Sequence, residues 1–404
     1  MAPEPVYGIR YQSVWGWMDP QDNRLYAIIG STDGTYIIEV TNPANPVKRA
    51  FIPGIRDSCI WHEYKTYQNF LYIISDDPVN AYNQNGLQIV DLSPLPDSVK
   101  IVHNGNTIIE RAHTLTRDGD LMYFNIPKGP SVGGSSKMAV FSLANPALPQ
   151  LLRRLEDDYP TLHGDVHDAF VRNDTIYASA GWDGLFVYRY DRNLNKFFLL
   201  GSLTSYPEQG YNHSSALSED GSILVMCDEV PDGLAIKILD VSDLSNIQVL
   251  TTFRSHQGAT PHNPYMIGNR WAIIAYYQDG VYIYDISNPL NPVVAGYFDT
   301  HPQNGDNNGY PQPAYMGCWA VYHEFGPGLL LASDMQNGLF ILDASQIIPT
   351  TSVPTYPRIS AIHPQHNNFL FLDLTGRFLN PIPDNPFCSP IKNGNIPVYL
   401  YYRF

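Results

Sequence analysis

The chain has 404 residues, of which 44% are hydrophobic and 13% aromatic, and its 39 acidic and 24 basic residues give a formal net charge of −15. This acidic balance disfavours nucleic acid as a partner, because binding to phosphate backbones requires clustered Lys and Arg. No stretch approaches 18 uninterrupted apolar residues, so no transmembrane segment is expected. The opening MAPEPVYGIR lacks the basic and apolar regions of a secretory signal, so no signal peptide is expected in the chain as given.

Seven short apolar runs, each led by a Trp or His, recur at intervals of roughly 45 to 57 residues. After each comes a tight turn and a strand, as in DGTYIIEV (33–40) and DGVYIYDI (279–286). Another β-rich run precedes each turn, as in FLYIIS (70–75), and a Pro-Asn turn leads to a fourth strand, as in SNPLNPVVAGYF (287–298). Four strands in each of seven units predict an all-β, seven-bladed β-propeller. The leading residues, called anchors below, are Trp15, Trp61, His113, His167, His213, His262 and Trp319.

The last unit ends near ILDAS (341–345) without a recognisable outer strand. EPVYGIRYQ (4–12) resembles NPVVAGYFD (291–299), an outer strand of the preceding unit. We therefore expect an N-terminal strand to close the last blade, which would leave no open seam between the first and last units. Residues 1–349 would then form the propeller, and residues 350–404 a linker with a short C-terminal β extension.

Several motifs in the chain are similar to those of a known family. They include VWGWMDP (14–20), GTYIIEVTNPANPV (34–47), SCIWHEYKTY (58–67), GLQIVDL (86–92), AHTL (112–115), HGDVHDA (163–169) and GCWAVYHEFGPGLLLASDMQNGLFIL (317–342). In this order they resemble the LVIVD-repeat proteins, and within them the choice-of-anchor B family of exported bacterial propellers. The resemblance covers roughly residues 5–345 and implies a secreted or surface-attached propeller. It implies no particular activity.

Two short runs near the C-terminus, FLDLTGR (371–377) and VYLYYR (398–403), resemble parts of the C-terminal sorting domain used by type IX secretion in Bacteroidetes. The Pro-Asn-Pro strand opening usual in that domain is not evident here. A plain β-hairpin extension packed on the propeller is the alternative. The four cysteines (Cys59, Cys227, Cys318 and Cys388) show no CxxC spacing, so we expect buried free thiols rather than a zinc knuckle.

Because the innermost strand of a blade lines the channel, all seven anchors are expected there as ligand-binding residues. The three Trp anchors form one arc, which would bind a sugar or aromatic ligand or simply pack between blades. The four His anchors form the opposite arc, and imidazoles that converge on a channel can bind a divalent metal such as zinc. Hydrogen bonds to neighbouring blades or water, or an organic ligand, are the alternatives. The predicted metal ligands are His113, His167, His213 and His262.

The loops between second and third strands carry acidic residues, which are expected to form an acidic rim on the face that carries the anchors. These residues are Asp33, Asp76, Asp77, Asp183, Asp228, Glu229, Asp279 and Asp334.

The chain contains no GxSxG elbow, HExxH helix, P-loop or dinucleotide fingerprint, so no catalytic residue is singled out. The sequence favours an exported or cell-surface propeller that binds an extracellular protein or a small ligand through its channel face. The alternative is a metal-dependent hydrolase or lactonase with a His-rich central site, which would activate water at a divalent metal cofactor.

Overall fold

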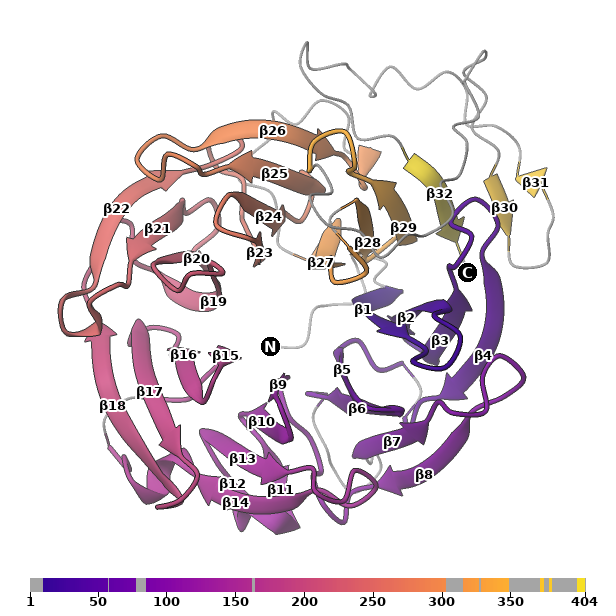
Figure 1. Ribbon diagram of the computed structural model, residues 1–404, viewed down its shortest axis with the longest axis horizontal. Coiled ribbons are helices and arrows are strands. Elements are labelled where there is room, and N and C mark those ends of the chain that lie inside the picture. Colours follow the sequence, from indigo (N-terminus) through magenta and orange to yellow (C-terminus); the bar gives the residue numbers. More distant parts are fainter. Residues whose placement is uncertain are drawn as a thin grey trace.

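Seven sheets, each built on four antiparallel strands, stand around a central channel and confirm the seven-bladed β-propeller (Figure 1). The computed structural model describes residues 10–56, 58–77, 85–161, 164–302, 315–326 and 328–348, and strands at 371–373, 378–379 and 398–403. Short 3-10 turns occur in these residues: η2 (Pro130–Val132), η3 (Leu155–Asp157) and η4 (Leu244–Asn246). None of the helices in this part of the chain has the length and apolar content that spanning a membrane requires.

Each blade runs outward from the channel in four positions. The innermost strands are β1 (Tyr11–Met18), β5 (His62–Tyr67), β9 (Thr114–Asp118), β15 (Asp168–Arg172), β19 (Tyr211–Leu217), β23 (Asn263–Ile267) and β27 (Cys318–Tyr322). The second strands are β2 (Leu25–Ser31), β6 (Phe70–Ser75), β10 (Leu121–Asn125), β16 (Thr175–Ser179), β20 (Ile223–Val230), β24 (Trp271–Ala275) and β28 (Leu329–Asp334). The third strands are β3 (Gly34–Glu39), β7 (Leu87–Asp91), β13 (Met138–Ser142), β17 (Leu185–Asp191), β21 (Ile236–Asp240), β25 (Val281–Asp285) and β29 (Gly338–Asp343). The outer strands are β4 (Val47–Pro53), β8 (Lys100–Gly105), β14 (Gln150–Arg154), β18 (Lys196–Leu203), β22 (Gln248–Phe253), β26 (Val293–Phe298) and β32 (Val398–Arg403).

Short additions decorate blades three and seven. In blade three, the chain between the second strand β10 and the third strand β13 forms a two-stranded hairpin of β11 (Lys128–Gly129) and β12 (Gly134–Ser135). In blade seven, β30 (Phe371–Asp373) runs parallel to β32, and β31 (Phe378–Leu379) pairs with β30.

The hydrophobic core lies between adjacent blades rather than inside any one of them. Every residue of β2 and of β24 is buried, because a second strand has a neighbouring blade against each face, whereas the outer strand β4 is largely exposed. The Asp-Gly turn expected before β25 requires its glycine. Gly280 has φ 78°, and a Cβ at this position would lie 2.1 Å from the Phe298 carbonyl oxygen. Only glycine fits this turn without strain.

The predicted closure of the last blade is wrong. The position beside β29 is taken by β32, whose register pairs Leu339 with Tyr402 and Leu342 with Val398. Residues 4–9 of the predicted closing strand lie outside the described residues, and Tyr11 instead begins the innermost strand of blade one. The outer strand of blade seven is therefore the C-terminal VYLYYR segment, which the sequence had suggested to be part of a sorting domain or a separate hairpin.

The seam between blades one and seven is closed by direct contacts. The backbone N–H groups of Arg10 and Tyr11 both donate to the carbonyl oxygen of Met335, at 2.8 and 3.0 Å. One buried cluster also joins the two blades, with Val14 and Leu25 on one side and Leu331 and Ile341 on the other. The propeller thus joins its first and last blades by packing as well as by backbone hydrogen bonds.

Candidate ligand and metal site in the central channel

Six of the seven anchors form an unbroken series of ring contacts around the channel. Successive ring centroids lie 4.1, 4.3, 4.3, 4.2 and 5.1 Å apart in the order His113, His167, His213, His262, Trp319 and Trp61. The positions are equivalent from blade to blade. The N–H of His113, His167 and His262 each donates to the carbonyl oxygen of the last residue of the second strand in the same blade. The spacing in the sequence therefore identified a real structural layer.

Trp15 lines the same channel but is not in this series. It lies within β1 opposite Ile28, and its ring packs edge-on against Tyr322, with centroids 5.0 Å apart. Its indole N–H donates to Thr66 Oγ1 at 3.0 Å, and Lys65 Nζ lies 3.9 Å from its ring centroid. Trp15 pairs with a residue three positions before the end of β2, whereas His113 bonds to the last residue of β10, so Trp15 lies deeper in its blade, which a count of residues does not reveal.

Hydrogen bonds at Nδ1 fix the orientation of the His rings. The Nδ1 of His167 lies 3.0 Å from the His213 carbonyl oxygen, and that of His262 lies 2.6 Å from the Trp319 carbonyl oxygen. A carbonyl oxygen only accepts, so both Nδ1 atoms carry the proton. In the neutral ring this leaves Nε2 with a free lone pair.

Three of the four imidazoles are held neutral by burial. Burial lowers the pKa of His167 and of His213 well below the usual value and the pKa of His262 to about 3. The neighbouring rings add to this effect at His167 and His213, because two positive charges in contact would repel one another.

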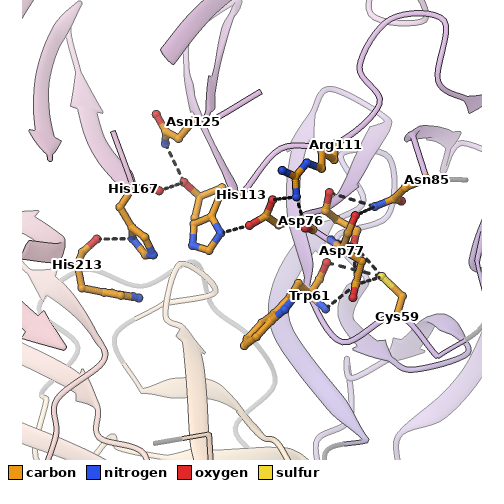
Figure 2. A network of polar contacts seen from close by, with 12 residues as sticks. Cys59, Trp61, Asp76, Asp77, Asn85, Arg111, His113, Asn125, His167 and His213 are labelled. Carbon is orange, nitrogen blue, oxygen red and sulfur yellow. Dashed lines mark hydrogen bonds and ion pairs between the residues drawn. The ribbon is translucent and has the colours of Figure 1, made fainter. Parts of the chain in front are cut away.

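His113 differs from the other three imidazoles. Burial would lower its pKa, but the hydrogen bond and the charge of Asp76 outweigh burial and raise the pKa. Its Nδ1 lies 2.7 Å from Asp76 Oδ2, and Arg111 reaches the other oxygen of the same carboxylate at 3.3 Å. Figure 2 shows His113 between this carboxylate and His167. The ring series therefore begins at an imidazole whose pKa is raised and continues with three imidazoles whose pKa values are lowered.

Glu229 lies beside the neutral end of the His arc. Its Oε2 lies 3.7 Å from His213 Nε2, and its other oxygen accepts a short hydrogen bond from the Tyr277 hydroxyl. His213, Glu229 and His262 each offer one ligand atom, and these atoms all lie within 4.8 Å of one another. His113 and His167, predicted as metal ligands with the other two, do not belong to this group.

The expected acidic rim is largely structural. Asp77, Asp228, Asp279 and Asp334 are buried, with at most 2% of their surface exposed. Asp228 forms an ion pair with the fully buried Lys237, with Nζ and Oδ2 2.8 Å apart. Only Asp76 and Glu229 of the expected rim contact the His arc. The sequence alone did not distinguish these two carboxylates from the others, because it does not show which loops point inward.

Asp77 organises the entry to blade two (Figure 2). Its Oδ2 accepts from the Cys59 thiol at 2.6 Å and from the backbone N–H of Ile60 at 3.0 Å and Trp61 at 3.3 Å. Burial and the nearby Asp77 charge raise the pKa of Cys59, so the thiol remains protonated. Cys59, Cys227 and Cys318 are buried free thiols, as expected, and Cys388 lies outside the described residues.

A cavity of about 500 Å³ occupies the channel, and residues of all seven innermost strands or their first turns line it. All seven anchors are among these lining residues. Glu63, Lys65 and Asp168 are among the charged side chains that line it. Glu63 accepts from the Trp319 indole N–H at 3.3 Å, which links the cavity wall to the ring series.

Burial acts on all three of these charged groups. It raises the pKa of Glu63 and of Asp168 and lowers the pKa of Lys65, while the opposite charges of Lys65 and the two carboxylates oppose these shifts. Sequence reasoning missed Glu63 as a cavity residue and Tyr277 as the partner of Glu229. The usable clue for Glu63 was its place two residues after Trp61, which puts both on one face of an extended strand.

Comparison with solved structures shows similarity of fold at low sequence identity. A putative 6-phosphogluconolactonase from Bacteroides fragilis is 11% identical, with 87% of this chain and 96% of that chain covered and a TM-score of 0.56. The periplasmic gluconolactonase PpgL of Pseudomonas aeruginosa is 12% identical, with coverage of 82% and 92% and a TM-score of 0.52. Sqt1 from Chaetomium thermophilum, bound to the N-terminus of ribosomal protein L10, is 12% identical, with coverage of 83% and 85% and a TM-score of 0.52.

These likenesses show the propeller fold alone. No curated protein sequence matches the chain. The LVIVD repeat model matches residues 267–300, which run from the end of β23 to just past β26 in blade six. The chain therefore carries an LVIVD repeat within a seven-bladed propeller, and this combination fits an LVIVD β-propeller.

Proposed function

We propose that this protein is a binding module that takes a small polyhydroxy ligand, of monosaccharide size, into its central channel. The observation that carries the proposal is the 500 Å³ cavity, which combines the aromatic and imidazole ring series with half-buried carboxylates. A volume of this size lies within the usual range for small-molecule sites. Aromatic faces pack against the C–H faces of a sugar ring, and carboxylates accept hydrogen bonds from its hydroxyl groups.

Glu63 and Asp168 are the acceptors that we assign to the ligand hydroxyls. They lie on β5 and β15, which blade three separates, so a ligand held by both would bridge the inner edges of blades two and four. Lys65, from the same strand as Glu63, supplies a positive charge within the cavity. This set suits a neutral sugar or a sugar acid.

Titration calorimetry with a panel of monosaccharides and aldonic acids tests the proposal. We expect at least one member to bind, and Glu63→Gln or Asp168→Asn to weaken its binding about 10-fold or more, since a hydrogen bond to a charged group contributes about 1.5 to 3 kcal/mol. Asp97→Asn, on the exposed turn after β7, is the matched control and should bind as the unaltered protein does. Absence of binding across the panel at millimolar concentration would contradict the proposal.

We also propose that the protein works outside the cytoplasm, secreted or at the cell surface. The support is the resemblance to exported choice-of-anchor B propellers. Fractionation of the native cells, with detection of the protein by antibody, tests this location. Recovery only from the cytoplasmic fraction would contradict it.

A metal-dependent hydrolase is the second candidate. The observation in its favour is the group formed by His213, Glu229 and His262, since three protein ligands leave a coordination position open for water, as in catalytic zinc sites. Water activated there would add to a lactone carbonyl carbon, and cleavage of the ring C–O bond would release a hydroxy acid.

Release of acid from glucono-δ-lactone tests this candidate, since the similar folds include a putative 6-phosphogluconolactonase and a gluconolactonase. We expect protein loaded with Zn²⁺ to exceed the metal-free protein at least 10-fold in rate, and Glu229→Gln to abolish the difference. Equal rates for loaded protein, metal-free protein and buffer would exclude this lactone as a substrate of the site.

A further inference from the structure

Two hydrogen-bond acceptors face each other at the neutral end of the His arc. His213 Nε2 and Glu229 Oε2 lie 3.7 Å apart, and both are buried. The hydrogen bonds on the far side of each group decide what lies between them. They show that His213 brings no proton to this gap and that the Tyr277 hydroxyl bonds to the Glu229 oxygen that faces away from it.

The tautomer of His213 follows from Ser214. The single proton of the Ser214 hydroxyl is donated to the His262 carbonyl oxygen at 2.7 Å. The Ser214 oxygen, 3.1 Å from His213 Nδ1, therefore accepts from that nitrogen. The proton of the neutral ring is on Nδ1, and Nε2 directs its lone pair toward Glu229.

His262 supplies a second lone pair to the same place. Its Nδ1–H donates to the Trp319 carbonyl oxygen, and its Nε2 is buried without a hydrogen-bond partner among the described residues. Only 1% of the His262 surface is exposed. A buried polar atom without a partner is costly, and a cation would satisfy it together with the two acceptors beside it.

We propose that His213, Glu229 and His262 bind one divalent transition-metal ion through the two Nε2 atoms and one carboxylate oxygen. Two imidazoles and a carboxylate are a common ligand set for Zn²⁺ and related ions. Ligands about 2.0 to 2.1 Å from a tetrahedral ion lie about 3.3 Å from one another, so the present separations, all within 4.8 Å, require only small side-chain shifts.

The surrounding contacts have the form of an outer ligand shell. The Nδ1–H of His213 donates to the Ser214 hydroxyl oxygen, and the Nδ1–H of His262 donates to the Trp319 carbonyl oxygen. Such bonds orient metal-binding imidazoles. The Tyr277 hydroxyl does the same for Glu229 by donating to the carboxylate oxygen that does not face His213. The site stands whether or not the channel binds a sugar or hydrolyses a lactone.

Direct metal binding tests the site. The full chain, purified without a metal-affinity column and treated with a chelator, is titrated with ZnCl₂ by calorimetry and dialysed for elemental analysis. We expect one Zn²⁺ per chain. We also expect Co²⁺ to give visible absorption bands typical of a tetrahedral site.

Variants separate this ligand set from the whole His arc. Glu229→Gln and His262→Gln should each weaken Zn²⁺ binding at least about 100-fold, because loss of even an outer-shell partner costs 10 to 100-fold. His262→Gln keeps a donor for the Trp319 carbonyl oxygen, and a thermal melt confirms that each variant is folded. His113→Ala, and the control His103→Ala on the outer strand β8, should bind Zn²⁺ like the unaltered protein.

Either of two results would overturn the inference. One is no stoichiometric Zn²⁺ or Co²⁺ binding by the folded, chelator-treated protein. The other is binding that survives Glu229→Gln and His262→Gln, or that His113→Ala weakens as much, which would move the ion elsewhere along the arc.

Discussion

At the scale of single residues, His62 carries a prediction for the pH dependence of stability. His62 is buried, and its Nδ1–H donates to Gln12 Oε1 over 2.8 Å. Burial lowers its pKa to about 4, against a partial opposing effect of the Asp77 charge. An unfolded His has a pKa of about 6.5, so between pH 6.5 and 4 only the unfolded chain binds this proton. Acidification through that window should therefore lower the free energy of unfolding by up to about 3 kcal/mol through His62.

Denaturant unfolding at several pH values, with a chelator present, measures this contribution. His62→Asn keeps a donor for Gln12 and removes the titrating ring, so the free energy of unfolding should depend less steeply on pH between 6.5 and 4. The other buried imidazoles retain part of the slope, since His167 and His323 also have lowered pKa values. His103→Asn, on the outer strand β8, should keep the full slope. An unchanged slope in His62→Asn would show that His62 protonates equally in the folded state.

At the scale of elements, the outer strand of blade seven determines how the ring is closed. β32 adds four ladder pairs to β29, from Leu339–Tyr402 to Leu342–Val398. Each ladder hydrogen bond contributes roughly 1 kcal/mol net, so removal of residues 398–404 should cost a few kcal/mol. We expect this deletion to lower the melting temperature by roughly 5 °C and to expose the edge of β29 to association with other chains.

Deletion of residues 1–9 is the matched control for this experiment. This deletion removes no residue of β1 or of β32, the strand beside β29. Scanning calorimetry of the two shortened proteins compares them directly. A large loss on removal of residues 1–9, with none on removal of 398–404, would support the N-terminal closure expected from the sequence and contradict the strand order described here.

At the scale of the whole molecule, the repeat determines how much can be predicted. Each blade needs the same four short strands and the same tight turns, so the sequence pattern occurs seven times. A strand that is ambiguous in one copy can therefore be assigned from the other six. The closing strand occurs once and has no second copy for comparison. The sequence therefore favoured EPVYGIRYQ (4–12) as the closing strand, because it resembles an outer strand. VYLYYR (398–403) was not chosen, because it lies about 50 residues beyond the last regular unit.

The sequence by itself determined the all-β class, the number of blades and the channel position of the seven anchors, because these depend on local periodicity and turn chemistry. Only the tertiary structure decided which terminus closes the ring and that Trp15 lies outside the ring series. It also decided that His213 and His262 meet Glu229, while Asp77 and Asp228 serve the scaffold. Contacts between blades join residues about 50 or more positions apart, and their geometry depends on bulges and loop directions that the spacing of residues does not encode.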